Sequence, residues 1–125
     1  MGDEESIPLR VVVTRVVGTG AVIVVTGQLN DDSQVVLRMK AKGQIALRRD
    51  HLILDLAGLE RCDVGGLGAL IYIRRQALAQ GGSVRLVGLS GSPLRNFLRA
   101  GLSVVFPLYT ELSTASANWP PQPEP

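Results

Sequence analysis

The sequence is short of the residues from which many functional sites are built. It has one cysteine and one histidine, and aromatic residues make up only 4% of it. The lone Cys62 excludes an intrachain disulfide and a metal site made of several thiolates. His51 lacks the partners of a catalytic histidine, so we interpret both residues as ordinary parts of strands or their ends.

Long apolar segments are also missing. No apolar run approaches the roughly 20 residues that a membrane-spanning helix needs. The acidic start, MGDEES, lacks the positive and then apolar order of a signal peptide. We therefore expect a cytoplasmic protein without direct membrane insertion.

Charge of one sign is scarce as well. The 13 Lys and Arg residues and the 11 Asp and Glu residues give a formal net charge of +2, which does not favour a nucleic-acid partner. No carboxylate pair, metal-ligand cluster or nucleophile with its base is evident, so we expect no enzyme, no metal and no cofactor. The one loose basic cluster is typical of a solvated face, and it consists of Arg38, Lys40, Lys42, Arg48 and Arg49.

What the sequence does contain is a regular alternation of strand and helix patterns. Two β-branched runs joined by a Gly-containing link predict a hairpin, at residues 9–17 and 21–27. Further strands are predicted at 51–57, 83–89 and 104–109, and helices at 34–49, 66–80, 93–100 and 109–117. The segment 34–49 also shows a strand period, but its length and its NDDS start favour a helix. Ser92 and Pro93 are predicted as the N-cap and first residue of the third helix.

This order predicts the α/β class, with a single mixed sheet of about five strands, an N-terminal hairpin and about four helices. We expect residues 1–8 to form a flexible lead and residues 9–117 to form one folded domain. Residues 118–125 are rich in proline and are expected to be a disordered tail.

Four features of this domain resemble the STAS domain, which is shared by anti-sigma factor antagonists and sulfate-transporter tails. The strand LDLAGL is followed by an acid and a Gly-Leu pair that enters a helix (Asp63, Gly66, Leu67, Gly68). The segments AQGGSV (79–84), LRAGL (98–102) and VFP (105–107) match later parts of the family. The resemblance covers about residues 9–113 and implies a STAS-like fold.

The resemblance also implies a function. Bacterial members bind a kinase-type anti-sigma factor, which phosphorylates a serine directly after the loop acid and so ends the binding. Here Val64 and Gly65 follow Asp63, and the acids that the family carries at the end of its second strand are replaced by Gln28 and Asn30. Phosphoryl transfer needs a nucleophilic oxygen, which valine lacks. We therefore expect a docking protein with no phosphoacceptor at position 64, in which Val64→Ser with Gly65→Ser would restore phosphorylation.

The predicted partner-binding residues are Gln28, Asn30, Cys62, Asp63, Val64, Gly65, Gly66, Leu67, Ile71, Leu89 and Ser90. Some alternatives stay open. One alternative to partner binding is that Asp63 and the glycines serve helix capping alone. A second is that the GGLG segment binds a nucleotide. A third is that Ser90 or Ser92 is phosphorylated in place of residue 64. The domain would also suit an accessory subunit or scaffold of a membrane transporter or of a stress-signalling assembly. Whether the chain forms a homodimer is open too.

Overall fold

One mixed sheet organises the protein. The computed structural model describes residues 7–122, and its six strands run in the order β1-β2-β3-β5-β6, with β4 paired to β2. The β1–β2 hairpin is antiparallel and the other pairs are parallel, so the predicted α/β class and mixed sheet are confirmed. The strands are β1 (Arg10–Val17), β2 (Gly20–Leu29), β3 (His51–Asp55), β4 (Leu59–Cys62), β5 (Ser83–Val87) and β6 (Leu108–Tyr109).

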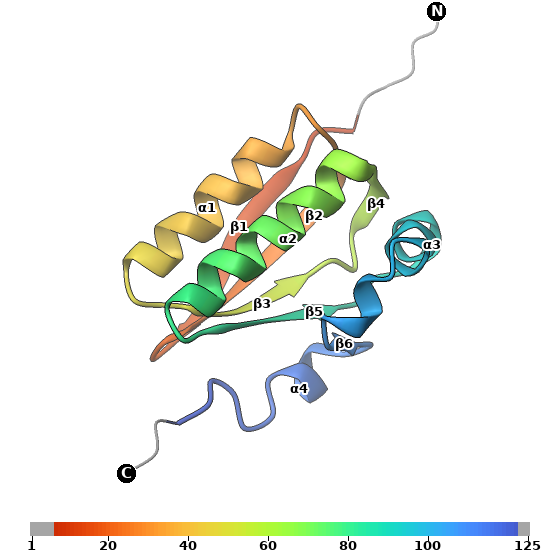
Figure 1. Ribbon diagram of the computed structural model, residues 1–125. Helices are drawn as coiled ribbons and strands as arrows, with labels where there is room; N and C mark the ends of the chain where they lie inside the picture. Colours follow the sequence, from red (N-terminus) through yellow and green to blue (C-terminus); the bar gives the residue numbers. More distant parts are fainter. Residues whose placement is uncertain (1–6, 123–125) are drawn as a thin grey trace, which may run out of the picture.

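Helices cover both faces of the sheet. Figure 1 shows α1 and α2 side by side on one face, α3 beside β4, and α4 on the opposite side of the sheet. The apolar sides of α1, α2 and α3 enclose the main core, in which Leu54, Leu70 and Phe97 are fully buried. The helices are α1 (Gln34–Ala46), α2 (Val64–Ala79), α3 (Gly91–Arg99) and α4 (Leu112–Ala115), with a short 3-10 helix η1 (Leu102–Val104) after α3.

A second, smaller core lies on the other face. There Val22, Ile53 and Val87 are covered by Ala115 and Trp119, and Trp119 is only 8% exposed. The expectation of a disordered tail is therefore wrong for residues 118–122, which the structure describes, because the indole of Trp119 packs over Gly20. A Cβ at Gly20 would lie 2.6 Å from the indole ring. Residues 123–125 lie outside the described residues, as do residues 1–6 of the predicted flexible lead.

Four local predictions are corrected. The sheet has a strand that the sequence pattern missed, β4, because only its end residues, Leu59 and Cys62, face the core. The helix α3 starts at Gly91 with Ser90 as its N-cap, because the backbone of Ser90 is extended while its carbonyl already accepts the Leu94 N–H. The predicted strand 104–109 shrinks to β6, and the last helix is a single turn.

The two ends of the described chain lie at opposite ends of the sheet (Figure 1). Ile7 and Pro8 pack against Gly27, near the carboxyl end of β2. Gln122 lies beside Thr19 and His51, at the amino ends of β2 and β3.

Candidate functional site

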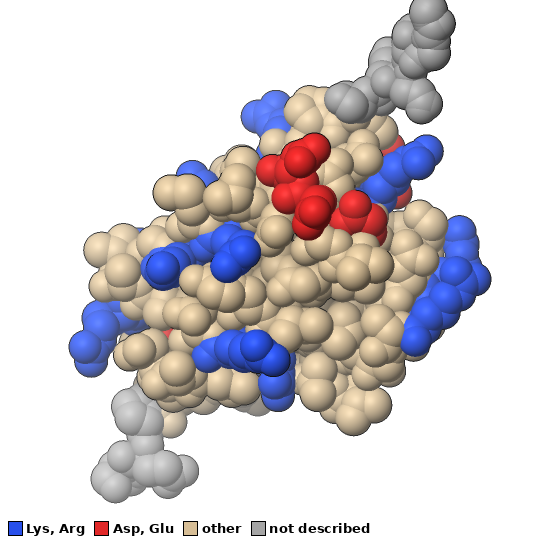
Figure 2. Space-filling view, turned by 45° about the horizontal axis from the view of Figure 1, so that its top comes forward, with Lys and Arg blue, Asp and Glu red and all other residues tan. Residues whose placement is uncertain are grey.

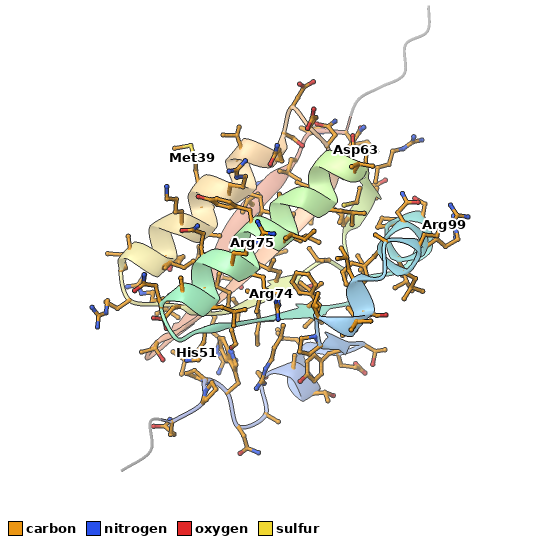
Figure 3. All side chains as sticks on the ribbon, viewed as in Figure 1. Met39, His51, Asp63, Arg74, Arg75 and Arg99 are labelled. Carbon is orange, nitrogen blue, oxygen red and sulfur yellow. The ribbon has the colours of Figure 1, made fainter. Side chains whose placement is uncertain are left out.

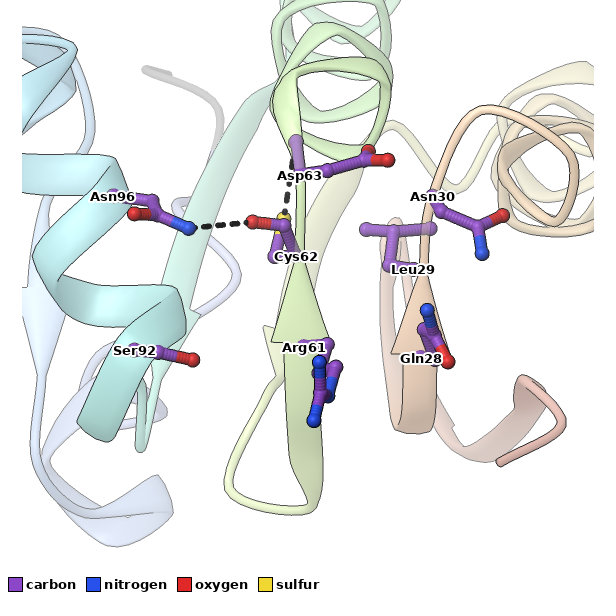
Figure 4. Close-up of a pocket in the computed structure, with 8 residues that line it drawn as sticks. All are labelled: Gln28, Leu29, Asn30, Arg61, Cys62, Asp63, Ser92 and Asn96. Carbon is purple, nitrogen blue, oxygen red and sulfur yellow. Dashed lines mark hydrogen bonds between the residues drawn. The ribbon is translucent and has the colours of Figure 1, made fainter. Parts of the chain in front are cut away.

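The carboxyl ends of β2 and β4 meet the first turns of α2 and α3 around a small pocket. Parallel strands bring their carboxyl ends to one edge of a sheet, where ligands and partners commonly bind. The pocket has a volume of about 230 Å³ (Figure 4). Its walls are formed by Gln28, Leu29, Asn30, Arg61, Cys62, Asp63, Ser92 and Asn96.

Asp63 fixes the start of α2. Its Oδ1 accepts the N–H of Gly66 at 3.0 Å, and its backbone carbonyl accepts the N–H of Leu67 at 2.9 Å. This is an N-cap, which satisfies a helix N–H that would otherwise lack a partner. The helix therefore begins at Val64, two residues before the predicted start, and the Val64 side chain is left 84% exposed.

An apolar groove of about 430 Å³ adjoins the pocket and runs between α2 and α3. Val64, Leu67 and Ala100 supply its apolar surface, and Arg99 lies on the α3 side. Asp63 and Asn96 line both the pocket and the groove, so the two hollows form one continuous surface. Asn96 is held in place by its side-chain N–H, which donates to the Cys62 carbonyl at 3.0 Å (Figure 4).

The glycines of this segment differ in how much space surrounds them. A Cβ at Gly65 would lie 2.8 Å from the Asp31 Cα, and one at Gly66 would lie 2.6 Å from the Leu29 carbonyl oxygen. Both residues thus let α2 start close to the end of β2. Gly68 is exposed, and a Cβ there would meet no described atom within 4 Å. Nothing inside the described chain therefore requires glycine at position 68.

The thiol of Cys62 is not reactive in this setting. Its side chain is buried, and burial, together with the nearby Asp63 carboxylate, raises the pKa of the Cys62 thiol to about 12. The thiolate is the nucleophilic form of cysteine, so the protonated Cys62 acts as a small apolar residue at neutral pH.

The amide of Asn30 has a structural task. Its Oδ1 accepts the N–H of Asp32 at 3.0 Å and that of Ser33 at 2.9 Å, which shapes the turn before α1. The Ser33 hydroxyl is also engaged, since it donates to the Gln28 carbonyl at 2.9 Å and accepts the Asn30 N–H at 3.0 Å. The turn before α1 is therefore closed by neutral groups.

The structure brings most of the predicted partner-binding residues together. Gln28, Asn30, Cys62 and Asp63 line the pocket, and Val64 and Leu67 line the groove. Gly65 and Gly66 form the first turn of α2. Ile71 and Leu89 instead pack against the main core, and Ser90 lies at the N-cap of α3 without lining either hollow.

Sequence reasoning missed six lining residues, which are Leu29, Arg61, Ser92, Asn96, Arg99 and Ala100. Arg61 was missed because β4 was missed. The α3 residues carried a weak signal, since a helix that follows a central strand starts at the same edge of the sheet.

Charge is unevenly distributed around this surface. Figure 2 shows acidic side chains gathered where α1 and α2 begin, with Lys and Arg side chains spread over the rest of this face. The exposed acids that precede these helices are Asp31, Asp32 and Asp63. Among residues 7–122, no three His, Cys, Asp or Glu side chains are grouped so that they could hold a metal ion. None of the described helices has the length and apolar character needed to span a bilayer.

Comparison with known families identifies the domain. The family model for the STAS domain matches residues 10–115. The chain belongs to the STAS domain family. No protein of curated function matches this STAS domain in sequence.

Solved structures of other proteins share the fold. An anti-sigma factor antagonist from Mycobacterium paratuberculosis is 23% identical with a TM-score of 0.74, over 94% of this chain and 97% of that one. The anti-sigma factor antagonist SpoIIAA in its unphosphorylated form is 21% identical with a TM-score of 0.74, over 86% of this chain and 95% of that one. The murine anion transporter Slc26a9 is 15% identical with a TM-score of 0.71, over 82% of this chain and 18% of the transporter chain.

Proposed function

We propose that this STAS domain is a bacterial anti-sigma factor antagonist that docks on a kinase-type anti-sigma factor and is not switched by phosphorylation at position 64. The observation that carries the proposal is the side chain of Val64, which is 84% exposed beside an apolar groove. Interfaces between proteins have apolar, poorly charged centres, and Val64 with Leu67 and Ala100 has that character.

Gly68 supports a docking role for the same surface. It lies one helical turn after Val64 on the same side of α2, where it leaves the helix surface next to the Val64 side chain bare. Glycine weakens a helix interior by about 0.5–1 kcal/mol relative to alanine. Because no described atom limits the space at Gly68, we attribute this cost to the close approach of a partner.

In this proposal the protein is a binding module and not an enzyme. Val64 has no oxygen for phosphoryl transfer, Ser33 uses its hydroxyl within the turn, and the Cys62 thiol is protonated. The protein would therefore regulate transcription in the cytoplasm by occupying its partner, and its binding would not be reversed by a phosphate on this loop.

Calorimetry with the kinase-type anti-sigma factor of the host tests the docking. Val64→Asp would place a charge at the apolar centre, and we expect it to weaken binding by about 30-fold or more. Val104→Asp is the matched control, because Val104 is 87% exposed and does not line the groove. If the unaltered protein does not bind at micromolar concentrations, or if both variants bind equally well, the proposed docking surface is wrong.

Phosphorylation tests the missing switch. We expect no phosphate on the unaltered protein after incubation with the kinase and ATP, and one phosphate on Val64→Ser. The single substitution is preferred to the double one that the sequence suggested, because a Cβ at Gly65 would clash with the backbone of Asp31. Phosphate on the unaltered protein that governs its binding would contradict the proposal.

A second candidate function has one supporting observation. A domain of this fold forms 18% of the chain of a murine anion transporter, so an accessory role on a membrane transporter suits the fold as well. The gene neighbourhood separates the two candidates. Adjacent sigma and anti-sigma factor genes favour the antagonist, and adjacent transporter genes favour the accessory subunit.

A further inference from the structure

The helix α1 carries apolar side chains on both of its sides. Leu37 and Ala41 are fully buried against the sheet. The opposite side, here called the outer α1 face, consists of Val35, Val36, Met39, Gly43, Ala46 and Leu47. Val35, Met39 and Leu47 on this face are 52%, 69% and 58% exposed, and Figure 3 shows Met39 pointing away from α2 and the sheet. Apolar side chains gathered on the solvent side of a helix mark a possible interaction surface.

Gly43 is not explained by contacts within the described chain. It lies inside α1, where glycine is less favourable than alanine, and it is exposed. A Cβ at this position would meet no described atom within 4 Å. A small residue on an apolar helix face lets a second helix pack closely, near the lower end of the usual 8–10 Å between helix axes. The outer α1 face is therefore shaped for a helix.

The charges along α1 itself have one sign. From Ser33 to Arg49 the chain has no acidic residue. Lys40 and Lys42 are exposed on the two flanks of the outer α1 face, and Arg48 and Arg49 follow its end. Arg38 is turned to the other helix, where its guanidinium lies 3.9 Å from the centre of the Tyr72 ring. The basic cluster seen in the sequence, apart from Arg38, thus borders an apolar surface.

We propose that the outer α1 face binds an amphipathic helix of a protein partner whose apolar stripe is flanked by Asp and Glu. Such a helix complements both the apolar centre and the basic flanks. A second copy of this chain fits less well, because it would place Lys40 and Lys42 against the same residues of its mate. An anionic membrane fits less well too, because a flat anionic surface would also meet the exposed acids Asp31 and Asp32 at the start of the same helix, whereas a partner helix can cross the face nearer Met39 and Leu47. This surface is separate from the groove at Val64, and the proposal does not depend on the antagonist function.

A designed peptide tests the chemistry of the partner. The probe is an 18-residue helical peptide with leucines at positions i, i+3, i+4 and i+7 and glutamates on both flanks, and its control carries lysine at every glutamate position. We expect the acidic peptide, titrated into isotope-labelled protein, to shift the amide signals of α1. The double variant Lys40→Glu with Lys42→Glu should weaken binding about tenfold or more, because two attractive pairs become repulsive. Arg75→Glu, an equal change per site at an exposed position of α2, should leave binding unchanged.

The variant Gly43→Leu tests the close approach. Its side chain projects into open space and leucine has the better helix propensity, so the thermal midpoint should not fall below that of the unaltered protein while the acidic peptide binds at least tenfold more weakly. Equal binding of both peptides, or no binding of the acidic one, overturns the proposal. A dimer in analytical ultracentrifugation that Met39→Glu dissociates, or sedimentation with phosphatidylglycerol vesicles, overturns it in favour of a second copy or of a membrane.

Discussion

Two alanine substitutions that lie two residues apart on α2 should change the stability in opposite directions. At Gly66 an added Cβ would lie 2.6 Å from the Leu29 carbonyl oxygen and 2.8 Å from the Cys62 sulfur, so the backbone of β2 or α2 has to move. Overpacking of this kind costs about 1–3 kcal/mol. At Gly68 the Cβ would enter open space, and alanine should raise the free energy of unfolding by about 0.5–1 kcal/mol through its better helix propensity.

Urea unfolding of the two variants, followed by far-ultraviolet circular dichroism and by the fluorescence of the single tryptophan, measures this difference. In thermal unfolding, each 1 kcal/mol corresponds to about 4 °C for a domain of this size. Two variants that shift the midpoint in the same direction would refute the account of the α2 start. A further readout connects stability to function: Gly68→Ala should be more stable than the unaltered protein and yet bind the proposed partner less tightly.

Three further predictions concern capping, titration and the second core. Asp63→Ala should lower the free energy of unfolding by about 1 kcal/mol through the loss of the bond to the Gly66 N–H, whereas Asp63→Asn should retain most of it; equal losses in urea unfolding would contradict the cap. The pKa of the Cys62 thiol rises from 9.0 to about 12 on folding, so its contribution to stability should be complete below pH 9 and be lost as the pH rises toward 12. For the same reason iodoacetamide should modify Cys62 slowly at pH 8 until urea unfolds the protein, and a rate like that of a free cysteine would disprove the burial argument. Trp119→Ala should cost about 3 kcal/mol, measured by circular dichroism, and a loss near zero would show that the second core adds nothing.

The sequence predicted the parts of the fold that repeat a simple period. The β-branched hairpin and the continuous apolar run of β3 have few other interpretations, and α2 shows a helical period that ends shortly before Gly81. The strand β4 could not be found in this way. Its four residues are too few to show a clear alternation of apolar and polar side chains. Its place in the sheet depends on the partner strand β2, which extends past Gly27 to pair with it.

The site was predictable where residue type decided the geometry and not where packing did. Asp63 was placed correctly at the start of α2, because few other residue types cap helices so well. Asn96 and Arg99 reach the same surface only because α3 packs beside β4, a tertiary contact without a local signal. At Trp119 the sequence predicted too little structure. The proline-rich composition suggested disorder, whereas the one large aromatic side chain packs over Gly20.

The separation of Ile7 and Gln122 at opposite ends of the sheet decides how the protein can be handled in experiments. A label, affinity tag or surface anchor attached through the C-terminal side lies far from Val64 and leaves both the groove and the pocket open. The same attachment on the N-terminal side starts beside Gly27, close to the very surface whose binding is to be measured.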